Sequence, residues 1–208
     1  MQTRRDLVRL GKSLFDRGLT PGSSGNLSVK LKDGFLFTPT NSCLGFLAAE
    51  RLSKLGTNGE YISGDKPTKE LPLHFAFYEA RPQAMAVVHL HSTYATLLSC
   101  LADTDPENAI PPITPYVVMR VGRVPVVPYT RPGDSAVKAL ILEKAPAHPA
   151  ILLANHGPVV AGENLEAAVF ALEELEETAR LLLLARGMKV RHLTAEQVAD
   201  LEQSFPLR

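Results

Sequence analysis

The chain has 208 residues, 45% of them hydrophobic, which suits a single domain over residues 1–208 with a sizeable core. Its formal net charge is zero, which argues against proteins that bind nucleic acids or membrane surfaces through overall charge. No apolar run approaches the length of a membrane span, and no secretory signal is evident. The two cysteines, Cys43 and Cys100, lack the spacing of a metal site. We therefore expect a cytoplasmic protein.

The residue pattern in the first half of the chain predicts a mixture of helices and strands. Apolar residues at helical spacing, from Leu7 to Phe15, predict a first helix that ends at Gly18. Small residues at 22–26 predict a loop. Strands are expected at 27–31, 35–38 and 85–90, and helices at 70–79 and 92–101.

The second half continues this mixture and contains the clearest helix. Asn164 is a good N-cap for an apolar stripe that runs to Gly187. Thr194 and Gln197 form the pattern of a capping box for a short last helix. Strands are expected at 117–121, 124–127 and 150–154, and a helix at 134–144. Together the elements predict one α/β sandwich.

Three of the six histidines lie at the ends of predicted buried strands. His89 and His91 are two residues apart, so their side chains should point to the same side of the strand end. His156 follows another buried strand and precedes Gly157, where the backbone can turn sharply. Three imidazoles with a vacant fourth position are typical of a catalytic metal site. A short His-x-His match also occurs in proteins without metal, so the spacing alone leaves both interpretations open.

Five short motifs, in one order, resemble the class II aldolase/adducin family. They are Ser24-Gly25-Asn26-Leu27-Ser28, Phe37-Thr38-Pro39-Thr40, Pro67-Thr68-Lys69-Glu70, His89-Leu90-His91 and Asn155-His156-Gly157. The resemblance extends from the first helix to the long one and therefore covers most of the chain. It implies a three-layer α/β/α sandwich whose central sheet is mainly antiparallel.

The resemblance also implies the parts of an active site. One divalent cation per subunit would be held by His89, His91 and His156; zinc is the first expectation, with manganese, cobalt and magnesium as alternatives. Glu70 would be the acid/base residue beside the cation. The subunits would form a homotetramer with active sites at their interfaces.

A group of small and hydroxyl residues is expected to bind the phosphate of the substrate. Loops of small residues expose backbone N–H groups that suit an anion, although the same composition also occurs in ordinary turns. The family's phosphate-binding positions correspond here to Gly25, Asn26, Thr40, Asn41 and Thr68.

Two positions differ from the pattern common in the family's aldolases. Asn41 follows Thr40 where a glycine is frequent, and Thr68-Lys69-Glu70 replaces a frequent Ser-Ser-Glu. Lys69 adds a positive charge beside the expected cation. It could select an acidic substrate, or it could extend into solvent as most lysines do.

Three further residues are candidates for substrate contacts. By resemblance, Tyr116 would act as a proton donor supplied by the adjacent subunit, although a packing role is the alternative. Arg120 and Arg131 could each hold a substrate carboxylate through a two-pronged contact. His74, on a predicted helix, is interpreted as structural.

These features predict a metal-dependent lyase that acts on a small phosphorylated keto acid or ketose. A three-histidine site supplies a Lewis acid that stabilises an enediolate. The short chain, Thr68-Lys69-Glu70 and Arg131-Pro132-Gly133-Asp134 resemble the family's 3-oxo-tetronate 4-phosphate decarboxylase branch. We expect decarboxylation of that substrate to dihydroxyacetone phosphate.

Three alternatives remain at this point. A sugar-phosphate aldolase of the fuculose or ribulose type would use the same intermediate, and a thioribulose phosphate dehydratase is a further enzymatic option. A non-catalytic, adducin-like binding module would have no need of three histidines and an acid.

Overall fold

The structure is a computed structural model that describes residues 2–207. Its helices are α1 (Gln2–Asp16), α2 (Leu71–Ala80), α3 (Thr93–Cys100), α4 (Pro115–Arg120), α5 (Val137–Lys144), α6 (Leu165–Leu184) and α7 (Ala195–Ser204), with 3-10 turns η1 (Leu44–Phe46) and η2 (Ala49–Arg51). Its strands are β1 (Asn26–Leu31), β2 (Gly34–Phe37), β3 (Ser53–Leu55), β4 (Tyr61–Ser63), β5 (Ala86–His89), β6 (Val126–Val127), β7 (Ala150–Leu153) and β8 (Gly157–Gly162).

All eight strands belong to one sheet with the order β4-β3-β2-β1-β5-β8-β7-β6. Only the β6–β7 pair is parallel, so the expected mainly antiparallel sheet is confirmed. The central strand β5 lies between β1 and β8, and its last residue, His89, is opposite Asn26 on one side and Val159 on the other. The single-domain prediction extends to residues outside those described and stays a prediction.

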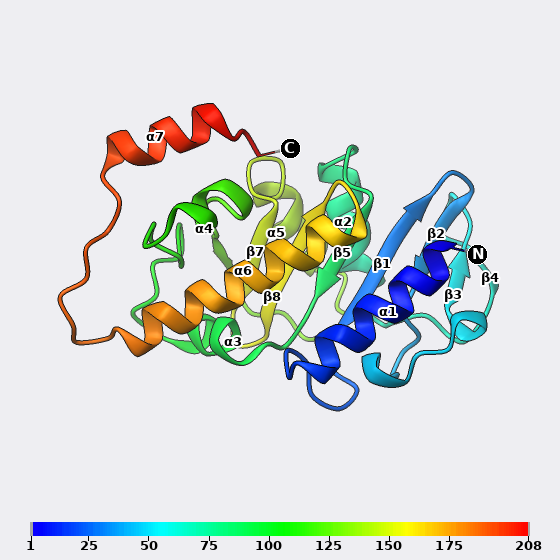
Figure 1. The fold of residues 1–208 in the computed structure, drawn as a ribbon. Coiled ribbons are helices and arrows are strands. Elements are labelled where there is room, and N and C mark those ends of the chain that lie inside the picture. The colour runs from blue at the N-terminus through cyan, green and yellow to red at the C-terminus, as the bar shows by residue number, and fades with distance from the viewer. Residues whose placement is uncertain (1, 208) are drawn as a thin grey trace.

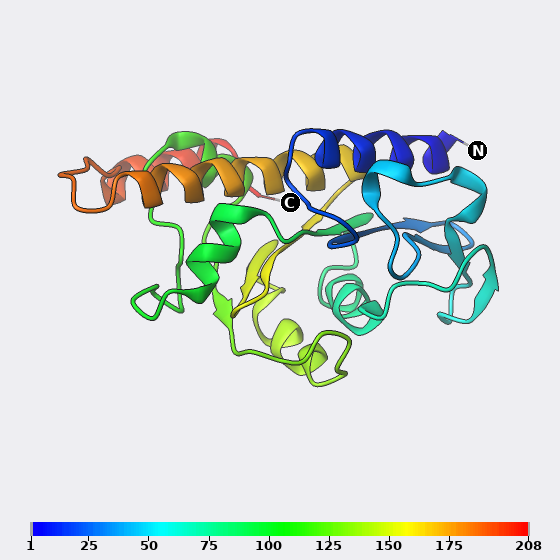
Figure 2. The same cartoon turned by 90° about the horizontal axis from the view of Figure 1, so that it is seen from below.

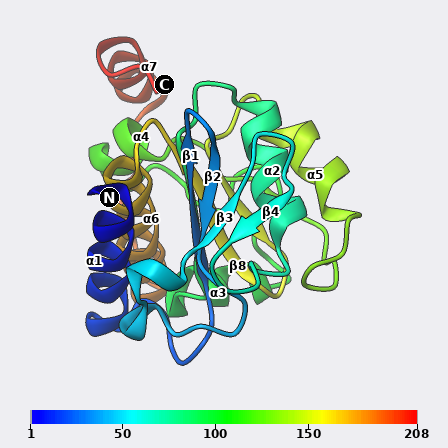
Figure 3. The same ribbon diagram turned by 90° about the vertical axis from the view of Figure 1, so that its right-hand side faces the viewer.

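Helices cover both faces of the sheet, as the three-layer prediction requires. One layer contains α1, α4 and α6, and the other contains α2 and α5 (Figures 2 and 3). Side chains that alternate along β5 divide between two hydrophobic cores: Val88 packs in the core under α1 and α6, and Val87 packs in the core under α2 and α5. His89 therefore faces the α2 layer.

The helix ends follow the chemistry expected from the sequence. The Asn164 side chain accepts a hydrogen bond from the Ala167 backbone N–H at the start of α6. Thr194 and Gln197 form the predicted capping box of α7. Helix α7 follows a long connection from α6 and packs beside α4 (Figure 1).

One predicted strand is wrong. Residues 117–121 lie in α4 and at its C-terminal end, not in a strand. The Thr114 side chain accepts a hydrogen bond from the Val117 backbone N–H, and Pro115 occupies the first turn. An N-cap followed by proline thus outweighs the β-propensity of two valines.

Three strands were not anticipated. They are β3, β4 and β8, each of which pairs with a neighbouring strand in the sheet. Within residues 2–207, no helix is both long enough and apolar enough to cross a membrane.

Candidate metal centre and active site

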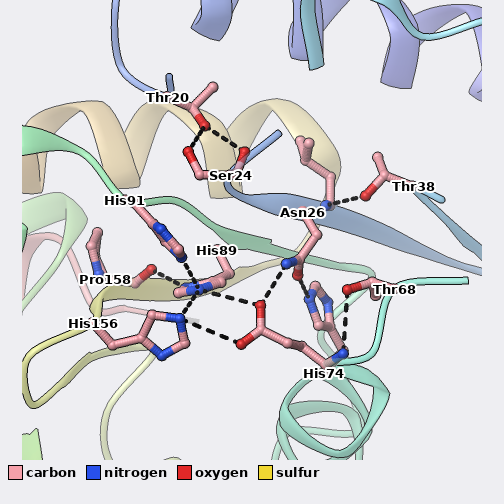
Figure 4. Close-up of polar contacts among 12 residues, drawn as sticks. Thr20, Ser24, Asn26, Thr38, Thr68, His74, His89, His91, His156 and Pro158 are labelled. Atoms are coloured by element: carbon pink, nitrogen blue, oxygen red, sulfur yellow. Dashed lines mark hydrogen bonds and ion pairs between the residues drawn. The ribbon is translucent and has the colours of Figure 1, made fainter. Parts of the chain in front are cut away.

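Three imidazole rings converge where β5 ends and the β7–β8 hairpin turns. The His89 Nε2 atom lies 3.2 Å from His91 Nε2 and 3.4 Å from His156 Nε2. One ligand atom from each ring lies within 4.8 Å of the others. Figure 4 shows the rings facing one another from separate segments of the chain.

The hairpin that carries His156 depends on two unusual backbone conformations. Asn155 adopts a φ of 56° and Gly157 a φ of 144°, both in the left-handed half of the conformational map. A Cβ atom at Gly157 would lie 2.5 Å from the carbonyl oxygen of Leu90. Glycine is therefore required for the hairpin to approach β5 closely enough to bring His156 to His89.

The nitrogen separations fit one shared tetrahedral cation. Two imidazole nitrogens that are each ~2.0–2.1 Å from a zinc ion at the tetrahedral angle lie about 3.3 Å apart. The two printed separations, 3.2 and 3.4 Å, bracket this distance. The Nδ1 atom of His89 lies 2.8 Å from the Pro158 carbonyl oxygen and donates to it, so the Nε2 lone pair of His89 points into the cluster. These three residues could therefore hold a divalent metal.

The electrostatics of the cluster favour neutral rings. Burial lowers the pKa of His89 and of His91, and it lowers the pKa of His156 to about 4. A neutral imidazole keeps the lone pair that a metal ligand requires. The rings can thus bind a cation at neutral pH without first losing a proton.

Glu70 precedes α2 and faces the three rings. Its two carboxylate oxygens lie 3.5 Å from the Nε2 atoms of His89 and His156. Although Glu70 is the N-cap residue of α2, its side chain makes no cap hydrogen bond. The carboxylate is therefore directed to the site and is not used to cap the helix.

Opposing effects set the pKa of Glu70. Burial raises the pKa of this carboxyl, but the neighbouring His89 and a hydrogen bond from Asn26 outweigh burial and hold the pKa below its usual range. The Asn26 Nδ2 atom donates this bond to the carboxylate over 2.7 Å. Glu70 therefore rests as a carboxylate near neutral pH.

A polar cavity of about 240 Å³ opens beside Glu70 and two of the rings. It is lined by the small and hydroxyl residues singled out in the sequence, together with Lys69: Ser23, Ser24, Gly25, Asn26, Pro39, Thr40, Asn41, Thr68, Lys69, Glu70, His91, Pro132 and His156. All five predicted phosphate-binding positions thus lie in one cavity with Glu70. Its volume suits a small polar ligand.

Gly25 and Asn41 have the backbone conformations that shape this cavity. Gly25 has a φ of 78°, and a Cβ atom there would lie 2.9 Å from Thr20 Oγ1 and 3.1 Å from the His89 carbonyl oxygen. Asn41 has a φ of 55°. Asparagine tolerates this conformation better than most residues, which explains why it can stand where related aldolases often have glycine.

The charged candidates differ in their distance from the site. Lys69 is exposed and lines the cavity, and its charge contributes to the low pKa values of His91 and His156. Arg131 is at the rim: it lines a narrow pocket shared with Glu70 and His156, and its side chain is 81% exposed.

Tyr116 and Arg120 do not lie in the cavity of their own chain. Arg120 lines a separate pocket with Gly162, at the end of β8 opposite His156. The six residues of β8 span roughly 17 Å at the usual rise per residue. Tyr116 is 53% exposed, and the Arg120 guanidinium lies 5.6 Å from the centre of its ring.

Sequence reasoning missed a polar row beneath Glu70. His74, Ser28 and Tyr78 are buried and form a hydrogen-bonded chain that continues from Asn26. Their spacing was a usable signal: His74 and Tyr78 follow Glu70 at intervals of four along a helix, and Ser28 follows Asn26 at an interval of two along a strand. His74 is therefore packed, as expected of a structural residue, but it also contacts the site.

Comparison with known proteins gives a consistent result. Residues 5–183 match the family described as Class II Aldolase and Adducin N-terminal domain. The chain is 56% identical over 201 residues to the 3-oxo-tetronate 4-phosphate decarboxylase of Pectobacterium atrosepticum, covering 96% of this chain and 92% of that protein. It is 36% identical to the L-fuculose phosphate aldolase of Haemophilus influenzae, covering 87% and 83% respectively.

The fold is also similar to solved structures. The crystal structure of YgbL from Klebsiella pneumoniae superposes with a TM-score of 0.93 at 54% sequence identity, covering 96% of this chain and 97% of that one. The structural comparison therefore agrees with the sequence comparison.

Proposed function

The chain belongs to the class II aldolase and adducin family, and on that premise we propose that it decarboxylates 3-oxo-tetronate 4-phosphate to dihydroxyacetone phosphate. The observation that carries the proposal is the convergence of three imidazoles and one carboxylate beside a cavity lined with anion-binding groups. The 56% identity to a relative with this activity supports the choice of substrate.

His89, His91 and His156 hold one divalent cation in this proposal, with zinc as the first candidate. Three neutral imidazole nitrogens match the ligand preference of zinc and leave a fourth position vacant, and the two separations from His89 Nε2 suit a tetrahedral ion. When bound, the cation supplies a Lewis acid that stabilises negative charge developing on a neighbouring oxygen. Manganese, cobalt or magnesium could replace zinc in the cell, where availability also determines occupancy.

The chemistry breaks the bond between the carboxyl carbon and C2 of the substrate. Carbon dioxide leaves without the bonding electron pair, which is delocalised towards the ketone at C3. A proton must then be added to C2, so each turnover consumes one proton from solvent. Glu70 is the group placed to deliver that proton, because its carboxylate faces the rings at the edge of the cavity.

The cavity and its rim offer groups that suit both charged ends of the substrate, the phosphate and the carboxylate. Gly25, Asn26, Thr40, Asn41 and Thr68 surround a space that suits the phosphate. Lys69 and Arg131, at the cavity and its rim, add positive charge for the carboxylate. A sugar phosphate without a carboxylate would gain less from these two cations. The cations therefore favour a substrate that carries both a phosphate and a carboxylate.

The active enzyme is a cytoplasmic homotetramer in this proposal, and a neighbouring subunit supplies Tyr116 and Arg120. Both residues are exposed at the far end of β8 from the histidines, so they can reach a site only across a subunit interface. Tyr116 would act as a proton donor and Arg120 as a second contact for the carboxylate.

The proposal is tested by measuring carbon dioxide release from 3-oxo-tetronate 4-phosphate with zinc present, and by identifying the product. We expect dihydroxyacetone phosphate and carbon dioxide in equal amounts. Glu70→Gln, which keeps the shape of the side chain but cannot carry the proton, should lower kcat by about 10²–10⁴-fold. Wild-type protein that releases no carbon dioxide but cleaves fuculose or ribulose phosphate would establish the aldolase alternative instead.

A further inference from the structure

A row of buried polar side chains connects β1 to α2 beneath the active site. Asn26 and Ser28 lie on the face of β1 that packs against α2, and α2 presents His74 and Tyr78 on the face where Glu70 begins the helix. All are buried, in a region where an unpaired polar group is costly. Figure 4 shows His74 beside Asn26 on the far side from the metal cluster.

The row is continuous from Tyr78 to Glu70. The Tyr78 hydroxyl lies 2.8 Å from Ser28 Oγ, which lies 2.7 Å from His74 Nδ1. The other ring nitrogen of His74, Nε2, lies 2.5 Å from Asn26 Oδ1. The Asn26 Nδ2 atom lies 2.7 Å from Glu70 Oε2. Every side chain between the two ends therefore has a partner on both sides.

The direction of each hydrogen bond follows from the carboxylate end. A carboxylate can only accept, so Asn26 must turn its NH2 group to Glu70 and its carbonyl oxygen to His74. That oxygen requires a donor, so His74 must carry its proton on Nε2. Burial lowers the pKa of His74 to about 3, so the ring is neutral and its Nδ1 atom accepts from Ser28.

We propose that His74 is a positioning residue whose Nε2–H holds the Asn26 amide in the one orientation that donates to Glu70. The inference rests on the proposed function, in which Glu70 transfers the proton to carbon. A rotated amide would place its carbonyl oxygen against the carboxylate, and the resulting repulsion would displace Glu70 from the rings. With the Ser28 hydroxyl donating to Nδ1, the His74 proton stays on Nε2, where it opposes this rotation.

Variants of His74 test the role in catalysis. His74→Leu removes the donor and puts an apolar side chain of similar size in its place, and we expect kcat to fall about 100-fold with KM changed less than threefold. His74→Gln can still donate an N–H to Asn26, and we expect it to keep kcat within about fivefold of wild type. His148→Gln, on the α5–β7 connection, is the matched control and should leave kcat unchanged.

Two readouts separate positioning from a general loss of structure. Bound metal per subunit should be the same in His74→Leu as in wild type, because the two ring nitrogens of His74 bond to Ser28 and Asn26 and not to the metal-binding rings. Equal kcat in wild type and His74→Leu, or equal losses in the Leu and Gln variants, would overturn the proposal. Loss of metal from His74→Leu would also overturn it, in favour of a structural role.

The tautomer can be measured without any activity. Nitrogen-15 NMR of protein labelled at the histidine ring nitrogens should show His74 neutral with its proton on Nε2, assigned by the signal lost in His74→Gln. A proton on Nδ1, or a charged ring at pH 7, would contradict the proposal whatever the activity of the variants. This measurement needs no substrate, so it is independent of the proposed function. Wild-type protein that is inactive on 3-oxo-tetronate 4-phosphate would contradict the proposed function, whereas the measured tautomer would still test the role of His74.

Discussion

Histidines in this chain have different roles because their surroundings differ. His89, His91 and His156 point their Nε2 atoms at one another, whereas His74 has hydrogen-bond partners on both nitrogens. The strand-end positions of the first three could be seen in the sequence. The sequence also places His74 on the same helix face as Glu70, but its hydrogen-bond partners depend on how α2 packs against β1, which the spacing does not reveal.

The pKa of His74 predicts a pH dependence of folding stability. Burial lowers the pKa from the ordinary 6.5 to about 3, so between these values the unfolded chain binds more protons than the folded one. This contribution to stability is complete above pH 6.5 and is lost as pH falls. As pH falls from 7 to 5, protonation of His74 in the unfolded chain should lower the free energy of unfolding by about 2 kcal/mol.

Urea denaturation of wild type and His74→Gln, with a chelator present to remove bound metal, measures this contribution. The variant should lose about 2 kcal/mol less between pH 7 and pH 5 than wild type. His148→Gln should keep the wild-type dependence. Identical dependences in wild type and His74→Gln would show that the buried ring is not a source of acid sensitivity.

At the scale of elements, a carboxylate from α6 fixes the start of α3 and so the position of His91. The Glu176 side chain is buried and accepts hydrogen bonds of 2.8 Å from the backbone N–H groups of Tyr94 and Ala95. Helix α3 begins at Thr93, two residues after His91. A negative charge at this end also suits the helix dipole.

Removal of this contact should be costly. Glu176→Ala leaves one buried and one partly buried N–H group without their acceptor and should lower the unfolding free energy by about 2–3 kcal/mol, measured by urea denaturation. Glu176→Gln, which retains one acceptor oxygen, should lose less. Glu177→Ala on the same helix is the control. The Glu177 carboxylate is exposed, so its removal should change the free energy of unfolding by less than about 0.5 kcal/mol. A loss no larger than that of the control would show that Glu176 does not hold α3.

The elements that the sequence predicted well are those with strong local signals. The periodic apolar stripe of α6 and the capping boxes and N-caps are local features, and the structure confirms them. Strand β3 has only three residues, and β8 lies against the distant strand β5 as well as β7, a pairing that no local pattern reveals. The segment at 117–121 shows the reverse error, in which β-branched residues concealed a capped helix.

At the scale of the whole molecule, Tyr116 can take part in catalysis only if subunits of this protein assemble. Its own cavity lies at the opposite end of β8, so an active site would combine Glu70 of one subunit with Tyr116 of a neighbour. Assembly of this kind cannot be derived from the local pattern of the sequence, and the prediction of a tetramer therefore came from the family resemblance alone.

Subunit hybrids test this arrangement. Glu70→Gln and Tyr116→Phe should each have low activity alone, but subunits mixed in equal amounts and reassembled should recover about a quarter of wild-type activity, because half of the sites have Glu70 and half of those have a neighbour with Tyr116. A mixture of Glu70→Gln with Asn26→Ala is the control and should recover none, since both residues serve the same cavity. No recovery in the first mixture would place Tyr116 outside the site.

The metal centre is the feature on which the whole account depends, and anomalous X-ray diffraction from crystals grown with zinc measures it directly. We predict one anomalous peak per subunit, about 2.0–2.1 Å from the Nε2 atoms of His89, His91 and His156. No peak at saturating zinc, or a peak that fails to contact all three rings, would contradict the account.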